Sequence, residues 1–399
     1  MLAVDFYVWQ GLRFLIQDTS QRVKQVFTYS YWGYTIFTFC FFAIMPMVDV
    51  RHSGMIFRII LSLIFAIFIL KIIWFVFVLM DDIIRVGKAT INSGNPTAIG
   101  DVSRSKFLQY MGLGLGGAFF GSMVFGITKG AHKYTFHRTK LAIKGLPKSW
   151  VGTKIVQISD IHSGSFYDKM AVQKGVDMIN AEDPDIVFFT GDLVNDRATE
   201  ILPFKEMFGS ITSKHGVYST LGNHDYGEYV KWPSAEAKAQ NVADLIDHHK
   251  DMGWDILMDE HRVIEKNGEK LVIMGVQNWS AKRNFPRYGD LGKAYAGSPA
   301  DTTKLLLSHD PSHWKEEITV NENYRDIAVT FSGHTHGMQF GIDSKWYRWS
   351  PVKLVYKEWI DLYNQDSQML YVNRGFGYLG FPGRVGIWPE ISVFTLEQA

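Results

Sequence analysis

The sequence KIVQISDIH at residues 154–162 is the first sign of the fold in the second part of this 399-residue chain. A short apolar run ends there in an aspartate and a histidine, and the same pattern recurs further along. Five runs of this kind read KIVQIS-DIH, IVFFT-GD, VYST-LGNHD, LLLS-HD and DIAVTFS-GHTH, starting at Lys154, Ile186, Val217, Leu305 and Asp326. Such runs predict the strands of a layered α/β core. A sixth strand is expected at Leu271–Val276 and a helix at Ala235–Met252. Because ligand sites gather at the carboxyl ends of strands, the five loops are expected to meet at one edge.

The residues that follow the runs are aspartate, histidine and asparagine, which bind transition metals. Carboxylate, imidazole and amide groups without cysteine suit Mn²⁺, Fe or Zn²⁺. Seven candidate ligands exceed what one ion needs, and they fit two ions that share a bridging carboxylate. Two ions ~3.5–4 Å apart make hydroxide at neutral pH and hold the oxygens of an in-line phosphoryl displacement.

In this order, the motifs DIH, GD, GNHD, SHD and GHTH resemble those of the calcineurin-like metallophosphoesterase superfamily, over roughly residues 152–396. The ending YVNRGFGYLGFPGRVGIWPEISVFTL also resembles the membrane-associated YkuE/YaeI-type branch. The resemblance implies a hydrolase of phosphate ester bonds, built as a β-sandwich flanked by helices around a dinuclear centre. It implies Mn²⁺ as the expected metal, with Fe or Zn²⁺ as alternatives.

The resemblance also assigns a role to each matched residue. Two divalent ions would be held by Asp160, His162 and His336 on one side and by Asn223, His309 and His334 on the other, with Asp192 as the bridge. His224 would be catalytic without binding metal, as a hydrogen-bond donor to the phosphoryl group or a proton donor to the leaving oxygen. We expect Asp225 and Asp310 to be capping or supporting carboxylates.

The second motif departs from one branch of the family. Phosphoprotein phosphatases typically read GDxxDR, whereas residues 191–197 here read GDLVNDR. Asn195 therefore stands where the second aspartate is expected, and the partner that orients His224 is left open. A phosphoprotein-type active site becomes less favoured.

The first third of the chain predicts a membrane module at residues 1–128. About 20 apolar residues cross a hydrocarbon core of ~30 Å, and three runs are long enough, at about 28–48, 59–80 and 107–128. The alternative is a set of buried helices in a soluble protein. Gly112/Gly116 and Gly117/Gly121 have the small-xxx-small spacing that lets helices approach closely in lipid.

Two features of this module need a structural explanation. Lys71 interrupts the second run and is costly there unless it snorkels, pairs or faces a polar cavity. Residues 4–16 are too short to span, and they fit an interfacial helix or the tail of a longer span.

The charge pattern sets further expectations. Lys and Arg total 41 against 40 Asp and Glu, which gives no reason to expect nucleic acid as a partner. The single cysteine, Cys40, excludes an internal disulfide and a cysteine zinc site. Residues 129–150 are expected to be a basic linker before a catalytic domain at 151–399. Basic residues are almost balanced on the two sides of the spans, and the cluster after the third span favours a cytoplasmic domain in a multi-pass cell-membrane protein.

The segment at residues 345–363 alternates aromatic and basic side chains directly after the GHTH loop. This composition fits a membrane interface, and it equally fits a half-buried strand pair on the core.

The function expected is a membrane-bound phosphoesterase that hydrolyses a phosphate ester or pyrophosphate bond by in-line attack of a metal-bridging hydroxide. The expected partners are the lipid bilayer and a phosphorylated lipid or lipid-linked substrate, for example a UDP-diacylglucosamine. One alternative is a phosphodiesterase or phosphatase for a soluble substrate, with the helices as an anchor. Another is a binding module without catalysis, which an intact set of metal ligands disfavours.

Overall fold

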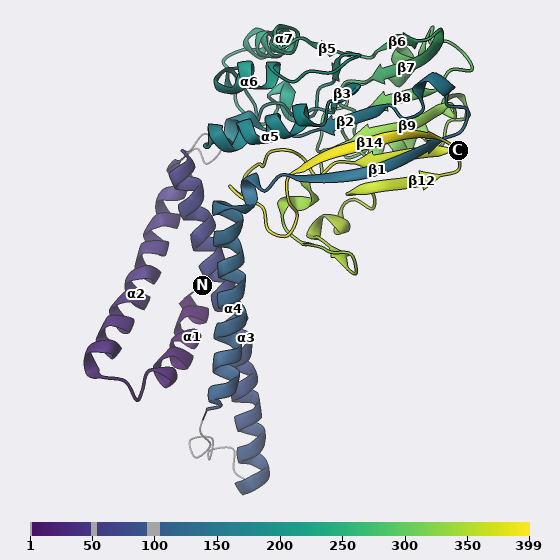
Figure 1. Ribbon diagram of the computed structural model, residues 1–399. Coiled ribbons are helices and arrows are strands. Elements are labelled where there is room, and N and C mark those ends of the chain that lie inside the picture. Colours follow the sequence, from purple (N-terminus) through teal and green to yellow (C-terminus); the bar gives the residue numbers. More distant parts are fainter. Residues whose placement is uncertain (1, 49–53, 94–103) are drawn as a thin grey trace. The chain divides into compact units, whose positions relative to one another are not determined.

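The computed structural model describes residues 2–48, 54–93 and 104–399. The chain divides into two compact units, Met1–Ile127 and Thr128–Ala399 (Figure 1).

The N-terminal unit is helical. Its helices are α1 (Leu2–Leu15), α2 (Gln21–Ile44), α3 (Met55–Ser93) and α4 (Lys106–Thr128). Among the described residues, two helices are long and apolar enough to cross a membrane, α3 over Met55–Ile91 and α4. They contain the expected spans at 59–80 and 107–128. The first expected span falls mostly on α2, which does not pass the same test, so a crossing by α2 stays a prediction.

Close helix packing explains one of the two glycine pairs in α4. A Cβ atom at Gly116 would lie 3.0 Å from the main-chain oxygen of Leu70, and one at Gly112 would lie 2.8 Å from Cβ of Phe77. Both positions therefore need glycine for α4 to approach α3. Gly117 and Gly121 have open space around them, so their spacing serves no contact within the described residues.

Lys71 is paired inside the helical unit. Its Nζ lies 2.5 Å from Oδ1 of Asp5 on α1, and both side chains are buried. The same ammonium lies 4.5 Å from the ring centroid of Tyr31 and 4.8 Å from that of Tyr34, where the ring faces attract a cation. Residues 4–16 thus pack as α1 against α3, and α1 supplies the carboxylate that a buried lysine requires.

The C-terminal unit is built on two six-stranded sheets (Figure 1). The first has the order β1 (Thr135–Ile143), β14 (Glu390–Gln398), β2 (Lys154–Ile158), β3 (Ile186–Phe189), β4 (Val217–Ser219) and β5 (Trp254–Ile256). The second has the order β12 (Asp361–Gln365), β13 (Gln368–Val372), β9 (Ile327–Ser332), β8 (Lys304–Leu307), β7 (Glu269–Gly275) and β6 (Glu260–Lys266). Strands β2, β3 and β4 are parallel neighbours, as are β7, β8 and β9. A separate hairpin joins β10 (Ile342–Asp343) to β11 (Arg348–Trp349).

The two sheets form a sandwich with helices on its outer faces. The core between the sheets contains Ile155 and Phe188 from the first sheet and Leu305 and Phe331 from the second. The helices of this unit are α5 (Lys169–Ala181), α6 (Lys205–Gly209), α7 (Ala235–Asp251) and α8 (Leu291–Tyr295). Helices α5 and α7 share an apolar cluster with the first sheet, and α8 shares one with the second. The expected fold class, a β-sandwich flanked by helices after an N-terminal transmembrane-type unit, is confirmed.

Short helical turns complete the chain. They are η1 (Met45–Met47), η3 (Gly130–His132), η4 (Lys148–Trp150), η5 (Ser163–Ser165), η6 (Ala198–Phe204), η7 (His224–Tyr226), η8 (Trp314–Ile318), η9 (Glu322–Tyr324), η10 (His336–Gln339) and η11 (Pro351–Leu354).

The segment expected as a basic linker at residues 129–150 is instead part of the C-terminal domain. It contains β1, which pairs in parallel with β14 over nine residues. Arg138 and Lys140 lie exposed while Leu141 and Ile143 are buried. The basic residues therefore occupy the solvent side of an edge strand, where charge blocks unwanted pairing.

Candidate metal centre

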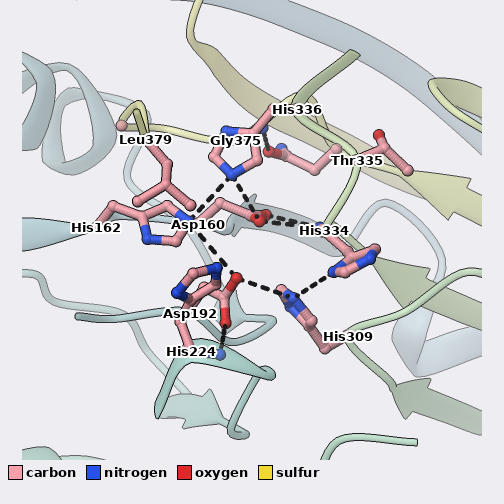
Figure 2. A network of polar contacts seen from close by, with 12 residues as sticks. Asp160, His162, Asp192, His224, His309, His334, Thr335, His336, Gly375 and Leu379 are labelled. Atoms are coloured by element: carbon pink, nitrogen blue, oxygen red, sulfur yellow. Dashed lines mark hydrogen bonds and ion pairs between the residues drawn. The ribbon is translucent and has the colours of Figure 1, made fainter. Parts of the chain in front are cut away.

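Five loops bring their polar side chains together at a shared edge of the two sheets (Figure 2). The loops after β2, β3 and β4 come from the first sheet, and those after β8 and β9 come from the second. The expected convergence therefore requires both layers of the sandwich, because no single sheet carries all five strands.

The first group of potential ligands consists of Asp160, His162 and His336, all buried. Oδ1 of Asp160 lies 3.2 Å from Nε2 of His336, and the Nε2 atoms of His162 and His336 lie 3.0 Å apart. Three donor atoms thus face one small volume.

The second group consists of Asp192, His309 and His334. Nε2 of His309 lies 3.1 Å from Oδ2 of Asp192 and 3.3 Å from Nδ1 of His334. Oδ1 of Asn223 lies 2.7 Å from the same Nδ1. Asn223, the seventh candidate ligand, therefore lies with this group.

Asp192 lies between the two groups. Its Oδ2 contacts Nε2 of His309 in the second group and lies 3.5 Å from Nε2 of His162 in the first. A carboxylate in this position fits the bridging role that the resemblance implies.

The backbone at the site adopts conformations that most residues avoid. Asp160, His162, Asp192, His334 and His336 all have positive φ, between 47° and 69°. Aspartate and histidine tolerate the left-handed region better than bulky residues do. Five strained positions among seven candidate ligands indicate a functional site that the surrounding fold holds in place.

Hydrogen bonds on the far side of the imidazoles fix their orientation. Nδ1 of His309 donates to the main-chain oxygen of Thr190 at 2.7 Å. Tyr356 donates its hydroxyl hydrogen to Oδ2 of Asp310 at 3.0 Å, and its oxygen lies 2.9 Å from Nε2 of His334. With Nε2–H of His334 donated to Tyr356, Nδ1 carries no proton and faces Oδ1 of Asn223 and Nε2 of His309, the other donor atoms of the second group. Such outer contacts orient ligands and tune their basicity.

The electrostatics of the residues fit two cations. Burial lowers the pKa of His162 well below its ordinary value and also lowers the pKa of His334, which leaves both rings in the neutral, metal-binding form. Burial opposes ionisation of Asp192, but the neighbouring histidines, His309 first, hold its pKa well below the usual range. Burial also lowers the pKa of His309, yet the carboxylates of Asp192 and Asp160 and the hydrogen bond to Thr190 together outweigh it and raise that pKa to about 10. A cation at Nε2 of His309 would replace the proton held there.

His224 lies beside the metal groups with one ring nitrogen fixed. Nδ1 donates to the main-chain oxygen of Asn195 at 2.7 Å, and the ring is half-buried next to that of His162. The partner of His224, left open by the sequence GDLVNDR, is thus the carbonyl of Asn195. Because a carbonyl only accepts, Nδ1 carries the proton and Nε2 is available at the site.

The two remaining motif carboxylates make supporting contacts. Asp225 accepts hydrogen bonds from the backbone N–H groups of Asp192, Leu193, Val194 and Gly222, at 2.8 to 3.2 Å. It thereby joins the loops after β3 and β4. Asp310 accepts from Tyr356 and from the backbone of Ser312. Neither carboxylate is in the two ligand groups.

The sequence analysis assigned no role to two residues that contact the site. Nη2 of the buried Arg384 lies 3.2 Å from Nδ1 of His336, and the same guanidinium donates to the carbonyl of Gly377. Tyr356 is one of several aromatic residues in residues 345–363, and the composition of that segment does not distinguish it from the others. A motif search finds residues near the strand ends, whereas these two arrive from later loops.

We expect Tyr356→Phe to weaken metal binding at the second group, since His334 loses the acceptor that holds its ring. Loss of such an outer contact typically lowers metal affinity ~10–100-fold. Metal titration of the purified protein measures the change, and excess metal should restore turnover. Tyr363→Phe is the matched control, because the Tyr363 hydroxyl bonds main-chain atoms of Trp359 and Lys357 in its own segment. Equal affinity in the two variants would contradict the role assigned to Tyr356.

A β-sandwich that presents two groups of aspartate and histidine donors around a central carboxylate defines a metal-dependent phosphoesterase type of domain. Comparison with known families agrees. Residues 153–338 match the family described as calcineurin-like phosphoesterase, and residues 1–131 match the one described as probable calcineurin-like phosphoesterase, transmembrane domain. The chain therefore carries a calcineurin-like phosphoesterase domain, preceded in the sequence by a region that matches the transmembrane domain of calcineurin-like phosphoesterases.

Several known proteins resemble the chain. A Danio rerio protein named as a transmembrane protein with metallophosphoesterase domain is 28% identical over 69% of this chain and 60% of its own length. The metallophosphoesterase YkuE of Bacillus subtilis is 27% identical, over 74% of this chain and 98% of its own. The UDP-2,3-diacylglucosamine pyrophosphatase LpxG of Chlamydia trachomatis is 26% identical, over 58% and 81%. The matched region spans only 60% of the Danio rerio protein and 48% of a Caenorhabditis elegans relative.

Proposed function

We propose that this protein is a membrane-bound hydrolase that uses two divalent metal ions to cleave a phosphate ester or pyrophosphate bond of a phosphorylated lipid or lipid-linked molecule. The observation that carries the proposal is the position of Asp192, whose carboxylate contacts histidines of both donor groups. Oxygen and nitrogen donors without sulfur favour Mn²⁺, with Fe or Zn²⁺ as alternatives.

Each residue of the site has a role in this proposal. Asp160, His162 and His336 would hold one ion, and Asn223, His309 and His334 the other, with Asp192 shared. Ions bound there would supply a nucleophile from water and Lewis acidity toward the phosphoryl oxygens. His224 would act as an imidazolium: its Nδ1–H stays bonded to the carbonyl of Asn195, and its Nε2–H would bond the phosphoryl group or pass its proton to the leaving oxygen.

The lipid character of the substrate is supported by two observations. Residues 1–131 match a transmembrane domain that belongs with this catalytic domain, which keeps the site near a bilayer. A relative named for a diacylated sugar nucleotide, LpxG, shares the domain. The basic residues that follow α4 favour a cytoplasmic location for the site by the positive-inside rule.

We expect a phosphorylated amphiphile to be hydrolysed in preference to its water-soluble headgroup analogue. The full chain is purified in detergent, loaded with Mn²⁺ and incubated with a membrane lipid extract, and phosphorylated species are followed by mass spectrometry. The specificity constants for one identified lipid and its headgroup are then compared.

The outcomes separate the parts of the proposal. Equal turnover of lipid and headgroup would overturn the lipid substrate and leave the helices as an anchor for a soluble-substrate enzyme. Absence of hydrolysis of the lipid extract, the headgroup and an aryl phosphate ester by metal-loaded protein would overturn the enzymatic proposal itself.

A further inference from the structure

The β10–β11 hairpin and the turn after it expose large apolar side chains. Every residue from 344 to 349 is exposed, and 89% of the surface of Trp346 is accessible. Leu354 in η11 is equally exposed, and Val355 follows it. The hairpin projects from the C-terminal domain (Figure 1). Soluble proteins rarely expose such clusters unless they bind a partner or a membrane.

The same surface is basic. Its exposed cations are Lys345, Arg348, Lys353 and Lys357. Arg348 forms ion pairs with Asp343 and Asp361, whereas neither Lys353 nor Lys357 forms an ion pair with any residue that the structure describes. The surface therefore keeps uncompensated positive charge beside its aromatic rings.

The other half of the segment is anchored at the candidate metal centre. Tyr356 and Trp359 are buried, and the Tyr356 hydroxyl lies 2.9 Å from His334. Thr335 donates its side-chain hydroxyl to the carbonyl of Trp359 at 2.6 Å, and Ser350 donates to that of Gly337 at 2.7 Å. The exposed surface is thus fixed to the GHTH loop, and residues 345–363 combine an exposed half with a buried half.

We propose that the surface formed by Lys345, Trp346, Tyr347, Trp349, Lys353, Leu354 and Val355 inserts into the headgroup region of a bilayer that contains anionic lipid. Tryptophan and tyrosine concentrate at this depth, and basic residues beside apolar ones bind anionic membranes. The match of residues 1–131 to a transmembrane domain indicates that the same chain is held at a bilayer. This second membrane contact would hold the edge that carries His334 against the headgroups. The membrane contact does not depend on the proposed hydrolysis. Under the proposed function, it would bring a lipid phosphate to the site.

The test uses the full chain with the exposed Cys40 replaced by serine. The Tyr347→Cys variant is labelled with an environment-sensitive fluorophore. It is then reconstituted into phosphatidylcholine vesicles that contain phosphatidylglycerol and a lipid with a quencher high on its acyl chain. We expect quenching of the label, and weaker quenching without phosphatidylglycerol. The control label is at Ala243, an exposed position on α7, which lies far from the hairpin in Figure 1. Equal signals at the two sites would overturn the proposal.

A second pair of variants tests which side chains make the contact. Trp346→Ala with Leu354→Ala should abolish quenching at position 347, while Met170→Ala with Leu202→Ala, which removes exposed apolar groups elsewhere, should leave it unchanged. Hydrolysis of an aryl phosphate ester should be equal in all of these proteins. Loss of hydrolysis in the parent protein with quenching intact would overturn the proposed function alone. In detergent, shielding of the label that increases with protein concentration would show that this surface contacts a second copy of the chain. That result would overturn the proposed membrane contact.

Discussion

Replacing Asp192 with alanine is expected to remove both metal ions and abolish hydrolysis. Its carboxylate contacts imidazole rings of both donor groups, so each ion would lose a ligand and a negative charge at once. Asp192→Asn keeps the shape and the acceptor for the backbone N–H of His224, which lies 2.8 Å from Oδ1, and isolates the effect of the charge. We expect elemental analysis to find close to two ions per wild-type chain and almost none in either variant.

Asn223→Ala is the matched control for Asp192. Asn223 contacts the second group through His334, so this variant should lose mainly one ion and keep the other. Chelation of the wild type should abolish hydrolysis of an aryl phosphate ester, and added Mn²⁺ should restore it. Full activity of metal-free protein, or loss of only one ion in both Asp192 variants, would contradict the shared-carboxylate arrangement.

His224→Ala is expected to retain both ions yet lose ~10²–10⁴-fold in turnover, the range for a positioned acid or hydrogen-bond donor. Metal should be retained because the contact of residue 224 with Asp192 uses the backbone N–H, which alanine keeps. Turnover should fall because alanine removes the imidazole, and with it Nε2, from the site. Steady-state kinetics and elemental analysis on the same preparation give both readouts.

His248→Ala serves as the comparison variant, since His248 is a half-buried histidine on α7 that contacts Lys205. It should leave turnover and metal content unchanged. If His224→Ala instead loses an ion, His224 is a ligand and the assignment of roles at this site is wrong.

The strands that carry the motifs were predictable because their signal is local. The six runs expected as strands correspond to β2, β3, β4, β7, β8 and β9, and Ala235–Met252 corresponds to α7. An apolar run that ends in ligand-type residues shows both the strand and the place where it ends. The identity of the candidate ligands followed from the same residues, and their metal binding stays a prediction.

The edge strands were less predictable. Residues 129–150 looked like a linker because Lys and Arg dominate their composition, yet alternate residues of β1 face the core. An edge strand needs apolar residues on one face only, and basic residues on the other face hide that alternation. For residues 345–363 the sequence left two alternatives open, because aromatic residues suit both a buried contact such as that of Tyr356 and an exposed surface such as that of Trp346.

The sequence alone was enough to identify the candidate metal ligands, their order along the chain, the class of the catalytic domain and two apolar helices that precede it. The tertiary structure alone decided that loops of two separate sheets share one edge, that Asp192 lies between the donor groups, and that the carbonyl of Asn195 holds His224. It also decided that Lys71 pairs with Asp5, 66 residues away. The physical reason is that side-chain chemistry and strand ends are properties of a few neighbouring residues. Distances across loops, the direction of a main-chain carbonyl and the partner of a buried charge depend on how distant strands and helices pack.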